Sequence, residues 1–314
     1  MRLILTILLI GLFKADAQMV INASSPYRPL LTGVLLNDYP NAAVAYSLRK
    51  LRTGYTGAAI RVRKDTTGQP EQDIGFTSVG DLDTSSLKSF LNARNGFVVT
   101  WYDQSGNGRN SSQSTQANQP RIANLGVIDR RSGDISIVFD GTNDHLINTV
   151  TGYQINNITH YAVSSRGNSA NTLRAIYSTG ILTTSNGFGF LYADNTNFSS
   201  QDLLFQQARN ALISVQNIGT YANTLNSNNL IFGITTSSID YTYYNGGDEK
   251  TLSHTRASVT SNNQTLIGAR LNDALTIVAQ YLNGTVSELV FWQSNQSANR
   301  TAIQNNINTY YSIY

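Results

Sequence analysis

Short β-prone runs recur along almost the whole chain, and turns rich in Asn and Gly separate them. This close spacing is typical of an antiparallel sandwich and leaves no room for the helical crossovers that a parallel sheet needs. In runs such as 60–63 and 135–139, apolar residues alternate with others, as in a half-buried strand. The sequence therefore predicts an all-β fold with strands at 59–63, 75–76, 97–102, 134–139, 160–164, 173–178, 187–192, 230–234, 264–268 and 285–292.

Two segments have a helical period instead. A short helix is predicted near 84–93, where Asp83 or Thr84 can cap the first turn, and a C-terminal helix near 297–313, where Ser297 can do so. The residues that share one face are Leu87, Phe90 and Leu91 in the first helix, and Ile303, Ile307 and Tyr310 or Tyr311 in the second. The terminal helix is expected to lie against the sandwich.

The composition favours an exported β-protein. Only 13% of the residues are charged, so Asn, Ser, Thr, Gln and Tyr must form much of the surface. The net charge of +3 comes from dispersed basic residues, which argues against a nucleic-acid partner. The absence of cysteine excludes disulfides and thiolate metal sites, and the three histidines lack the spacing of a zinc site.

The first 17 residues read as a signal peptide or hydrophobic N-terminal segment. The apolar run 3–13 precedes Ala15-Asp16-Ala17, a small-residue cleavage pattern, and is shorter than the about 20 residues that span a bilayer. An uncleaved anchor or an assembly segment is the alternative. Residues 18–41 are a predicted lead-in and 42–314 the sandwich domain. The expected location is secreted or cell surface, alternatively a virion or appendage surface, with no transmembrane span in the mature chain.

Three stretches carry a family resemblance. The run VTWYDQSGNG at 99–108, with the segment 44–63 before it, resembles the catalytic domain of the α-L-arabinofuranosidase B enzymes of glycoside hydrolase family 54. The run VFDGTNDHL at 138–146 resembles laminin-G-like and concanavalin A-like lectin/glucanase domains more broadly, and 267–290 matches how such domains end. The resemblance implies a concanavalin-like jelly-roll β-sandwich.

The resemblance also implies a retaining glycosidase, which needs two carboxyl groups about 5 Å apart. However, Arg174 occupies the expected nucleophile position before Ala-Ile-Tyr, and a guanidinium cannot attack an anomeric carbon. The acid/base position falls on Asn272, which leaves Asp273, one residue late, as the candidate. We therefore expect no inherited hydrolase activity. A relocated pair would have to come from Asp103, Asp140, Asp144, Asp194, Asp240, Asp248, Glu249 and Glu288.

Carbohydrate binding is the function that the residues favour. Aromatic faces cover the apolar side of a sugar ring, and amides and hydroxyls bond to its hydroxyl groups. The candidate binding residues are Asp103 and Asn107 in the loop after 97–102, and Tyr241, Tyr243, Tyr244 and Asn245 around a hairpin turn. Alternation places Tyr241 and Tyr243 on one face. Purely architectural roles, as a tight loop and an outer strand, are the alternative.

The sequence thus predicts an exported, lectin-like, carbohydrate-binding protein without hydrolase activity, whose partner is a polysaccharide or surface glycan. The alternatives are an arabinofuranosidase-like glycoside hydrolase with relocated carboxylates and a structural virion or appendage protein that contacts host glycans. No organic cofactor is expected. Calcium is an option, with Asp140 and Asp144 as its ligands. A homo-oligomer or larger assembly is left open.

Overall fold

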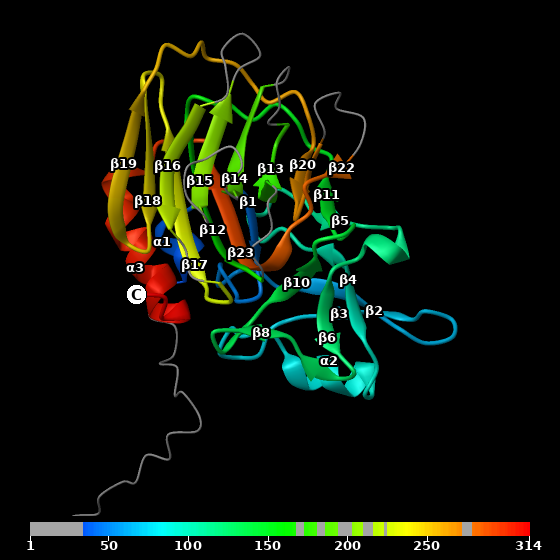
Figure 1. The fold of residues 1–314 in the computed structure, drawn as a ribbon. Helices are drawn as coiled ribbons and strands as arrows, with labels where there is room; N and C mark the ends of the chain where they lie inside the picture. The colour runs from blue at the N-terminus through cyan, green and yellow to red at the C-terminus, as the bar shows by residue number, and fades with distance from the viewer. Residues whose placement is uncertain are drawn as a thin grey trace, which may run out of the picture. The chain divides into compact units, whose positions relative to one another are not determined.

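The computed structural model describes residues 34–167, 173–180, 186–193, 203–209, 216–222, 225–271 and 278–314. The predicted N-terminal signal segment, Asp194, Asn272 and Asp273 lie outside these residues. The described chain is an antiparallel β-sandwich with α1 and α3 on one outer face, so the predicted fold class is confirmed (Figure 1). Among the described residues, no helix is long and apolar enough to cross a membrane.

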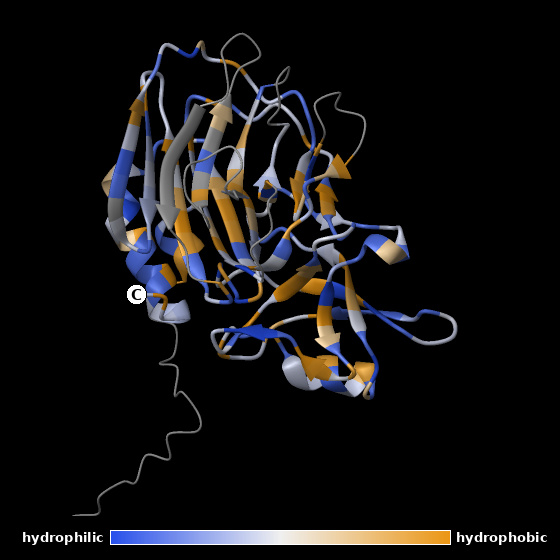
Figure 2. Cartoon of the chain, in the orientation of Figure 1, coloured by the Kyte–Doolittle hydropathy of each residue, from blue (hydrophilic) through white to orange (hydrophobic). Residues whose placement is uncertain are grey.

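The first layer is built around β12 (Ile158–Arg166), which pairs with β17 (Asn229–Thr235) on one side and β23 (Asn283–Trp292) on the other. Beyond β17 the layer continues through β18 (Ile239–Tyr244) to β19 (Gly247–Ser253). The far side of β23 pairs with β1 (Ala42–Ser47) and with β10 (Ile137–Asp140), each along a different stretch. Figure 2 shows β17 as strongly hydrophobic and the edge strand β19 as largely hydrophilic.

The second layer faces the first across the core. Its strands, in order of pairing, are β16 (Gln216–Ala222), β15 (Leu203–Arg209), β14 (Gly187–Ala193), β13 (Arg174–Ser178), β20 (Thr265–Ile267), β11 (Leu146–Asn148), β5 (Ser111–Ser112), β4 (Gly96–Trp101), β2 (Ile60–Lys64) and β3 (Glu71–Ile74). A further strand, β6 (Arg121–Asn124), pairs with both β4 and β10, and therefore joins the two layers at this end.

The remaining elements are short. They are α1 (Leu35–Asp38), the 3-10 turns η1 (Gln116–Asn118) and η2 (Ser297–Asn299), β7 (Val127–Ile128) beside β6, and the two hairpins β8 (Arg130–Arg131) with β9 (Asp134–Ile135) and β21 (Arg270–Leu271) with β22 (Val278–Ala279).

Two apolar clusters lie on opposite faces of the first layer. The larger one fills the space between the layers, and the smaller one is covered by α1 and by α3 (Arg300–Tyr311). Because successive strand residues point to opposite faces, β12 places Ala162 in the larger cluster and Tyr161 and Val163 in the smaller one. Burying a large apolar side chain stabilises a fold by about 1.5–3 kcal/mol, so both clusters support the same strand.

Both predicted helices are present. The first, α2, spans Thr84–Leu91, and the Asp83 carboxylate caps it by accepting from the backbone N–H groups of Ser85 and Ser86 at 3.1 and 3.0 Å. It ends where Asn92 takes the left-handed conformation. The C-terminal helix begins with the 3-10 turn at Ser297 and becomes α-helical only at Arg300.

Several strands differ from the prediction. The run 75–76 is not a strand: Phe76 makes an isolated bridge to Leu82, and the strand is β3, whose polar residues Glu71–Asp73 gave no hydrophobic signal. The run 134–139 is two strands, β9 and β10, because β9 pairs with β8 whereas β10 pairs with β23 and β6. Strands β15 and β16 were not predicted at all.

A buried ion pair ties β1, β23 and α3 together. Glu288 of β23 is fully buried and accepts from Nε and Nη2 of Arg49 at 2.8 and 2.9 Å. It also accepts from the hydroxyls of Ser47, Tyr161 and Tyr311 at 2.6, 2.6 and 3.1 Å. Burial alone would raise the pKa of Glu288, but the Arg49 charge and these hydrogen bonds lower it. Glu288 is therefore a structural carboxylate.

Candidate functional site

A polar cleft of about 440 Å³ opens where the two layers join. Strands β2, β4, β6 and β10 form its floor, and the turn after β2, the 3-10 turn η1 and the turn after β10 form its rim. Its lining consists of Arg63, Asp65, Gln69, Asn95, Phe97, Gln116, Ala117, Gln119, Arg121, Val138, Asp140 and Asp144. Amides, guanidinium groups and carboxylates therefore surround one aromatic ring.

Arg63 lines the cleft and is held by several side-chain contacts. The residue is 5% exposed, and its Nε donates to Oε1 of Gln119 at 2.6 Å. A second donor, Nη1, bonds to the side-chain oxygen of Gln69. The guanidinium carbon lies 4.7 Å from the centre of the Phe97 ring, a cation–π contact. Arg63 thereby fixes the orientation of Phe97 and of two amide groups that line the cleft.

A chain of amides extends from the cleft toward a buried histidine. The Gln119 side-chain nitrogen donates to the Gln113 carbonyl at 2.8 Å, and Gln113 Nε2 lies 3.0 Å from Nε2 of His145. On its other side, Nδ1 of His145 lies 2.8 Å from the Asn143 carbonyl. Burial lowers the pKa of His145 and so favours its neutral ring. This arrangement preorganises the amide rim of the cleft.

The turn after β10 presents two carboxyl groups to the cleft. Oδ1 of Asp140 accepts from the backbone N–H groups of Thr142 and Asn143 at 2.7 and 3.2 Å, and Oδ2 of Asp144 accepts from the Asp140 N–H at 3.0 Å. Asp140 is exposed, whereas Asp144 is 7% exposed. Burial, followed by repulsion from the Asp140 charge, raises the pKa of Asp144 to about 7.

Asn283 of β23 holds this turn from outside. Its Nδ2 donates to the Asp140 carbonyl at 3.2 Å. Gly141 has a φ of +79°, and a Cβ there would lie 2.7 Å from Cβ of Asn283. A Cβ at Gly167 would lie 2.5 Å from Oδ1 of Asn283. The Asn283 side chain therefore fills a slot that only glycine leaves open on both sides.

Calcium at Asp140 and Asp144 stays a prediction. The two carboxylates already accept backbone hydrogen bonds, and two groups supply fewer oxygens than the roughly six to eight that calcium takes. Within the described ranges, no cluster of three or more histidine, aspartate or glutamate side chains is placed to hold a metal ion.

The loop DQSGNG after β4 is anchored by its own side chains. Asp103 is 4% exposed, and its two oxygens accept from the backbone N–H groups of Ala45, Ser105 and Arg109 at 2.9, 2.9 and 3.0 Å. The exposed Asn107 donates from Nδ2 to the carbonyls of Ala42 and Ala43 at 3.0 and 3.1 Å. Asp103 is thus placed to shape the loop, while Asn107 lines a second cavity.

The tyrosine-rich strand is β18, and the order of strands in the sheet places it far from the cleft. As predicted, Tyr241 and Tyr243 share one face, because both pack against the smaller cluster, whereas Tyr244 packs against the larger one. Tyr243 is 6% exposed, and the Arg300 guanidinium of α3 lies 4.2 Å from its ring centre. Asn245 forms the turn and accepts from the Leu230 N–H at 2.9 Å. A ligand role for these four residues stays a prediction.

Arg174 begins β13, where its Nη1 donates to the Tyr281 carbonyl at 2.8 Å and lies against Gly141. The position expected for a nucleophile therefore holds a guanidinium that bonds to the backbone. Of the eight carboxyls considered for a relocated pair, Asp140 and Asp144 share a turn, Asp103, Asp240 and Glu288 are buried, and Glu249 is exposed. The side chain of Asp248 lies outside the described part.

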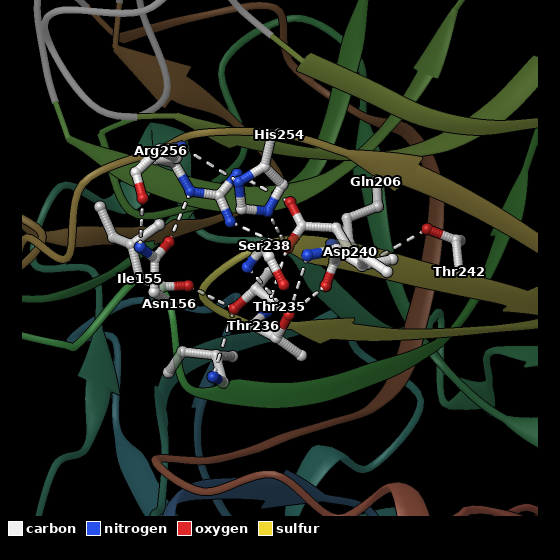
Figure 3. A network of polar contacts seen from close by, with 12 residues as sticks. Ile155, Asn156, Gln206, Thr235, Thr236, Ser238, Asp240, Thr242, His254 and Arg256 are labelled. Atoms are coloured by element: carbon white, nitrogen blue, oxygen red, sulfur yellow. Dashed lines mark hydrogen bonds and ion pairs between the residues drawn. The ribbon is translucent and has the colours of Figure 1, made fainter.

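A second polar cluster, at Asp240 of β18, is sealed from solvent. Its carboxylate accepts from both terminal nitrogens of Arg256 at 2.7 and 2.8 Å and lies 3.1 Å from Nε2 of His254 (Figure 3). Arg256 Nε donates to Oδ1 of Asn156 at 2.7 Å, and Asn156 donates back to the Arg256 carbonyl. All three charged or titratable side chains are 0% exposed. Since no substrate can reach them, the cluster is structural.

The sequence did not predict most of the residues that line the cleft. Asp140 and Asp144 were predicted as metal ligands or as members of a relocated carboxyl pair, and Arg63 only as part of the strand 59–63. Phe97, Gln119 and Arg121 come from segments that meet only after β4 and β6 pair. Because these residues are far apart along the chain, no local sequence pattern indicated that they share a site. The alternation in β2 indicated only that Arg63 is on the face opposite Val62.

Solved structures of other proteins resemble this fold, although the sequence matches none of the protein families searched. No family model and no curated protein matches the sequence. A mutant glycoside hydrolase family 54 α-L-arabinofuranosidase, soaked with 4-nitrophenyl α-L-arabinofuranoside, matches the structure with a TM-score of 0.68, 14% identity and coverage of 86% of this chain. An arabinofuranosidase complexed with arabinofuranosyl-α-1,2-xylobiose matches with a TM-score of 0.65, 16% identity and the same coverage.

This chain spans 63% of the length of each of these arabinofuranosidase chains. At such low identity the similarity concerns the fold. The resemblance predicted from the sequence is confirmed at that level: the described chain has the β-sandwich fold found in the glycoside hydrolase family 54 arabinofuranosidases.

Proposed function

We propose that the chain is a carbohydrate-binding, lectin-like β-sandwich protein that holds a polysaccharide or surface glycan in the cleft between β2, β4, β6 and β10. The observation that carries the proposal is the preorganised lining of this cleft: Arg63 fixes the ring of Phe97 and the amides of Gln69 and Gln119 at once. Sugars combine apolar ring faces with many hydroxyl groups, and this pairing of an aromatic ring with amides and carboxylates complements both.

A glycan array followed by titration tests the proposal. Phe97→Leu keeps apolar volume but removes the ring, so we expect the selected glycan to bind about tenfold more weakly, the size of one aromatic contact. Phe90→Leu is the matched control, because Phe90 is also half-buried and lies 5.7 Å from a lysine ammonium, but is outside the cleft. Equal binding by the two variants, or no retained glycan, would contradict the proposal.

Glycoside hydrolysis is a second candidate function, favoured by one observation. Asp144, with a pKa of about 7, lies in an open cleft beside the exposed Asp140, and a glycosidase pairs a protonated carboxyl with an ionised one. The hydrogen bonds that hold the Asp140 carboxylate in its turn favour binding over catalysis.

Hydrolysis of aryl α-L-arabinofuranosides separates the two functions. If Asp140 and Asp144 are a catalytic pair, the hydrolysis rate should fall at least about 100-fold in both Asp144→Asn and Asp140→Asn, because each carboxyl group would move a proton or form a bond. We expect instead that the wild-type protein binds glycan and releases no aryl alcohol above the rate of the buffer. A measurable wild-type rate lost in both variants would favour the hydrolase.

We also propose that the protein is exported and acts at the cell surface or in the medium. The support is the short apolar N-terminal run followed by Ala15-Asp16-Ala17 and the low content of charged residues. N-terminal sequencing of the mature protein tests this proposal: a chain that begins at Gln18 supports it, and a chain that retains residues 1–17 at the membrane or in an assembly contradicts it.

A further inference from the structure

A second cavity, of about 360 Å³, lies beside the DQSGNG loop. It is formed by the chain around β1, by the loop at 105–109 and by Gln293, which follows β23. Arg52 and Arg109 both line it, and its lining contains no carboxylate among the described residues. In this it differs from the cleft, whose lining includes three aspartates.

The Arg52 side chain is held in place but keeps unused donors. Its Nη1 donates to the Ser105 carbonyl at 3.3 Å, and the guanidinium lies against Gly106 so closely that a Cβ there would be 2.8 Å from Nη1. Its Nε is buried and has no acceptor among the described residues. Gln293 has the same feature, since its side-chain nitrogen is buried without an acceptor in the described chain.

The Arg109 side chain, which belongs to the same loop, is also held in place. Its Nη1 donates to the Ala43 carbonyl at 3.2 Å, and its guanidinium carbon lies 5.4 Å from the centre of the Tyr153 ring. The carboxylate of the loop, Asp103, is turned inward, where it accepts from backbone N–H groups and the Ser105 hydroxyl. Two cations therefore line one cavity whose described lining contains no carboxylate.

We propose that this cavity binds the carboxylate of an acidic sugar, a hexuronate residue of the glycan. A guanidinium presents parallel N–H donors that match a planar carboxylate, and two arginines line this one cavity. The exposed Asn41 and Asn107 can bond to the ring hydroxyls. The inference deepens the proposed function, because it assigns the glycan an acidic component and gives it a site separate from the cleft.

Titration with trigalacturonate and with neutral galactotriose tests the proposal. We expect the wild-type protein to bind trigalacturonate at least about tenfold more tightly, with binding that weakens as salt is added. Arg52→Gln should remove this preference and Arg52→Lys should restore part of it, because lysine keeps the charge but loses the planar fork. Arg94→Gln, which removes the same charge from an exposed position outside the cavity, should bind as the wild type does.

The outcomes separate this inference from the proposed function. Phe97→Leu should leave trigalacturonate binding unchanged if the acidic sugar is held in the second cavity. Equal binding of the two trisaccharides, or unchanged binding in Arg52→Gln with an unchanged unfolding temperature, overturns the inference even if the array retains neutral glycans. Competition by inorganic sulfate as strong as that by trigalacturonate also overturns it, since the cavity would then be a general anion site.

Discussion

At the scale of single residues, Asp144 is the group whose protonation should be visible in solution. Its pKa is about 7 in the folded protein and near 3.8 in the unfolded chain. Between these values the folded state binds more protons, so the free energy of unfolding falls as pH rises from about 4 to 7, by at most about 1.4 kcal/mol per unit. The loss then stays constant above pH 7.

Asp144→Asn should remove that slope, because the amide carries no titratable proton and can still accept from the Asp140 N–H. Urea unfolding at a series of pH values measures the effect, and the variant should gain stability over the wild type as pH rises. Asp65→Asn is the control, since Asp65 lines the same cleft but is exposed. Parallel wild-type and Asp144→Asn curves would show that the Asp144 carboxyl is not perturbed.

The sequence predicted the environment of these residues only in part. The turn residues of FDGTND indicated that Asp140 and Asp144 lie near one another, because a local turn fixes their spacing. The burial that raises the pKa of Asp144 arises only in the folded chain, where Asp144 shares the cleft with distant segments such as β6 that the local pattern does not contain. The same is true of Arg63. The alternation of residues along β2 predicted which face of the strand Arg63 occupies, but not its partners, the amides of Gln69 and Gln119.

At the scale of elements, the Arg49–Glu288 pair links β1, β23 and α3. Removing one partner of a buried pair leaves an uncompensated charge and costs about 3–5 kcal/mol. We therefore expect Glu288→Gln and Arg49→Met each to lower the free energy of unfolding by about that amount. The double variant should lose far less than the sum of the two, because it leaves no lone charge. Additive losses would mean that the two side chains act independently.

The elements that the sequence predicted well are those with an apolar face or a clear cap. Strands β12, β17 and β23 and the helix α2 fall within a few residues of their predicted bounds, since Asp83 and the runs of Ile, Val and Phe carry the signal locally. Strand β3 was misplaced because its residues 71–73 are exposed and polar, and pairing with β2 is what makes them a strand.

At the scale of the whole molecule, the two apolar clusters share the strands of the first layer. Leu289 lies in the larger cluster and its neighbour Val290 in the smaller one. Because one strand serves both, Leu289→Ala and Val290→Ala should each shift the same single unfolding transition, Leu289→Ala by about 2–5 kcal/mol and Val290→Ala by less. Far-ultraviolet and aromatic circular dichroism measure this, with the 70% exposed Val127→Ala as a near-neutral control.

A second, separate transition in Val290→Ala would show that α1, α3 and their cluster unfold independently of the sandwich. The sandwich itself followed from the spacing of strands and turns, because strand periodicity is a local property. The joining of the two layers through β6 did not, since a short strand that pairs with both β4 and β10 depends on contacts between distant segments.

The position of the Asn283 side chain between Gly141 and Gly167 affects the choice of expression host. Asn283, Gly284 and Thr285 form an acceptor sequence for N-linked glycosylation in a secretory pathway. Nδ2 donates to the Asp140 carbonyl and lies beside Gly141, so a saccharide attached to it would crowd the turn after β10. We therefore expect glycosylation at Asn283 in a eukaryotic expression host to disturb the turn at the rim of the cleft, and bacterial expression to preserve that turn.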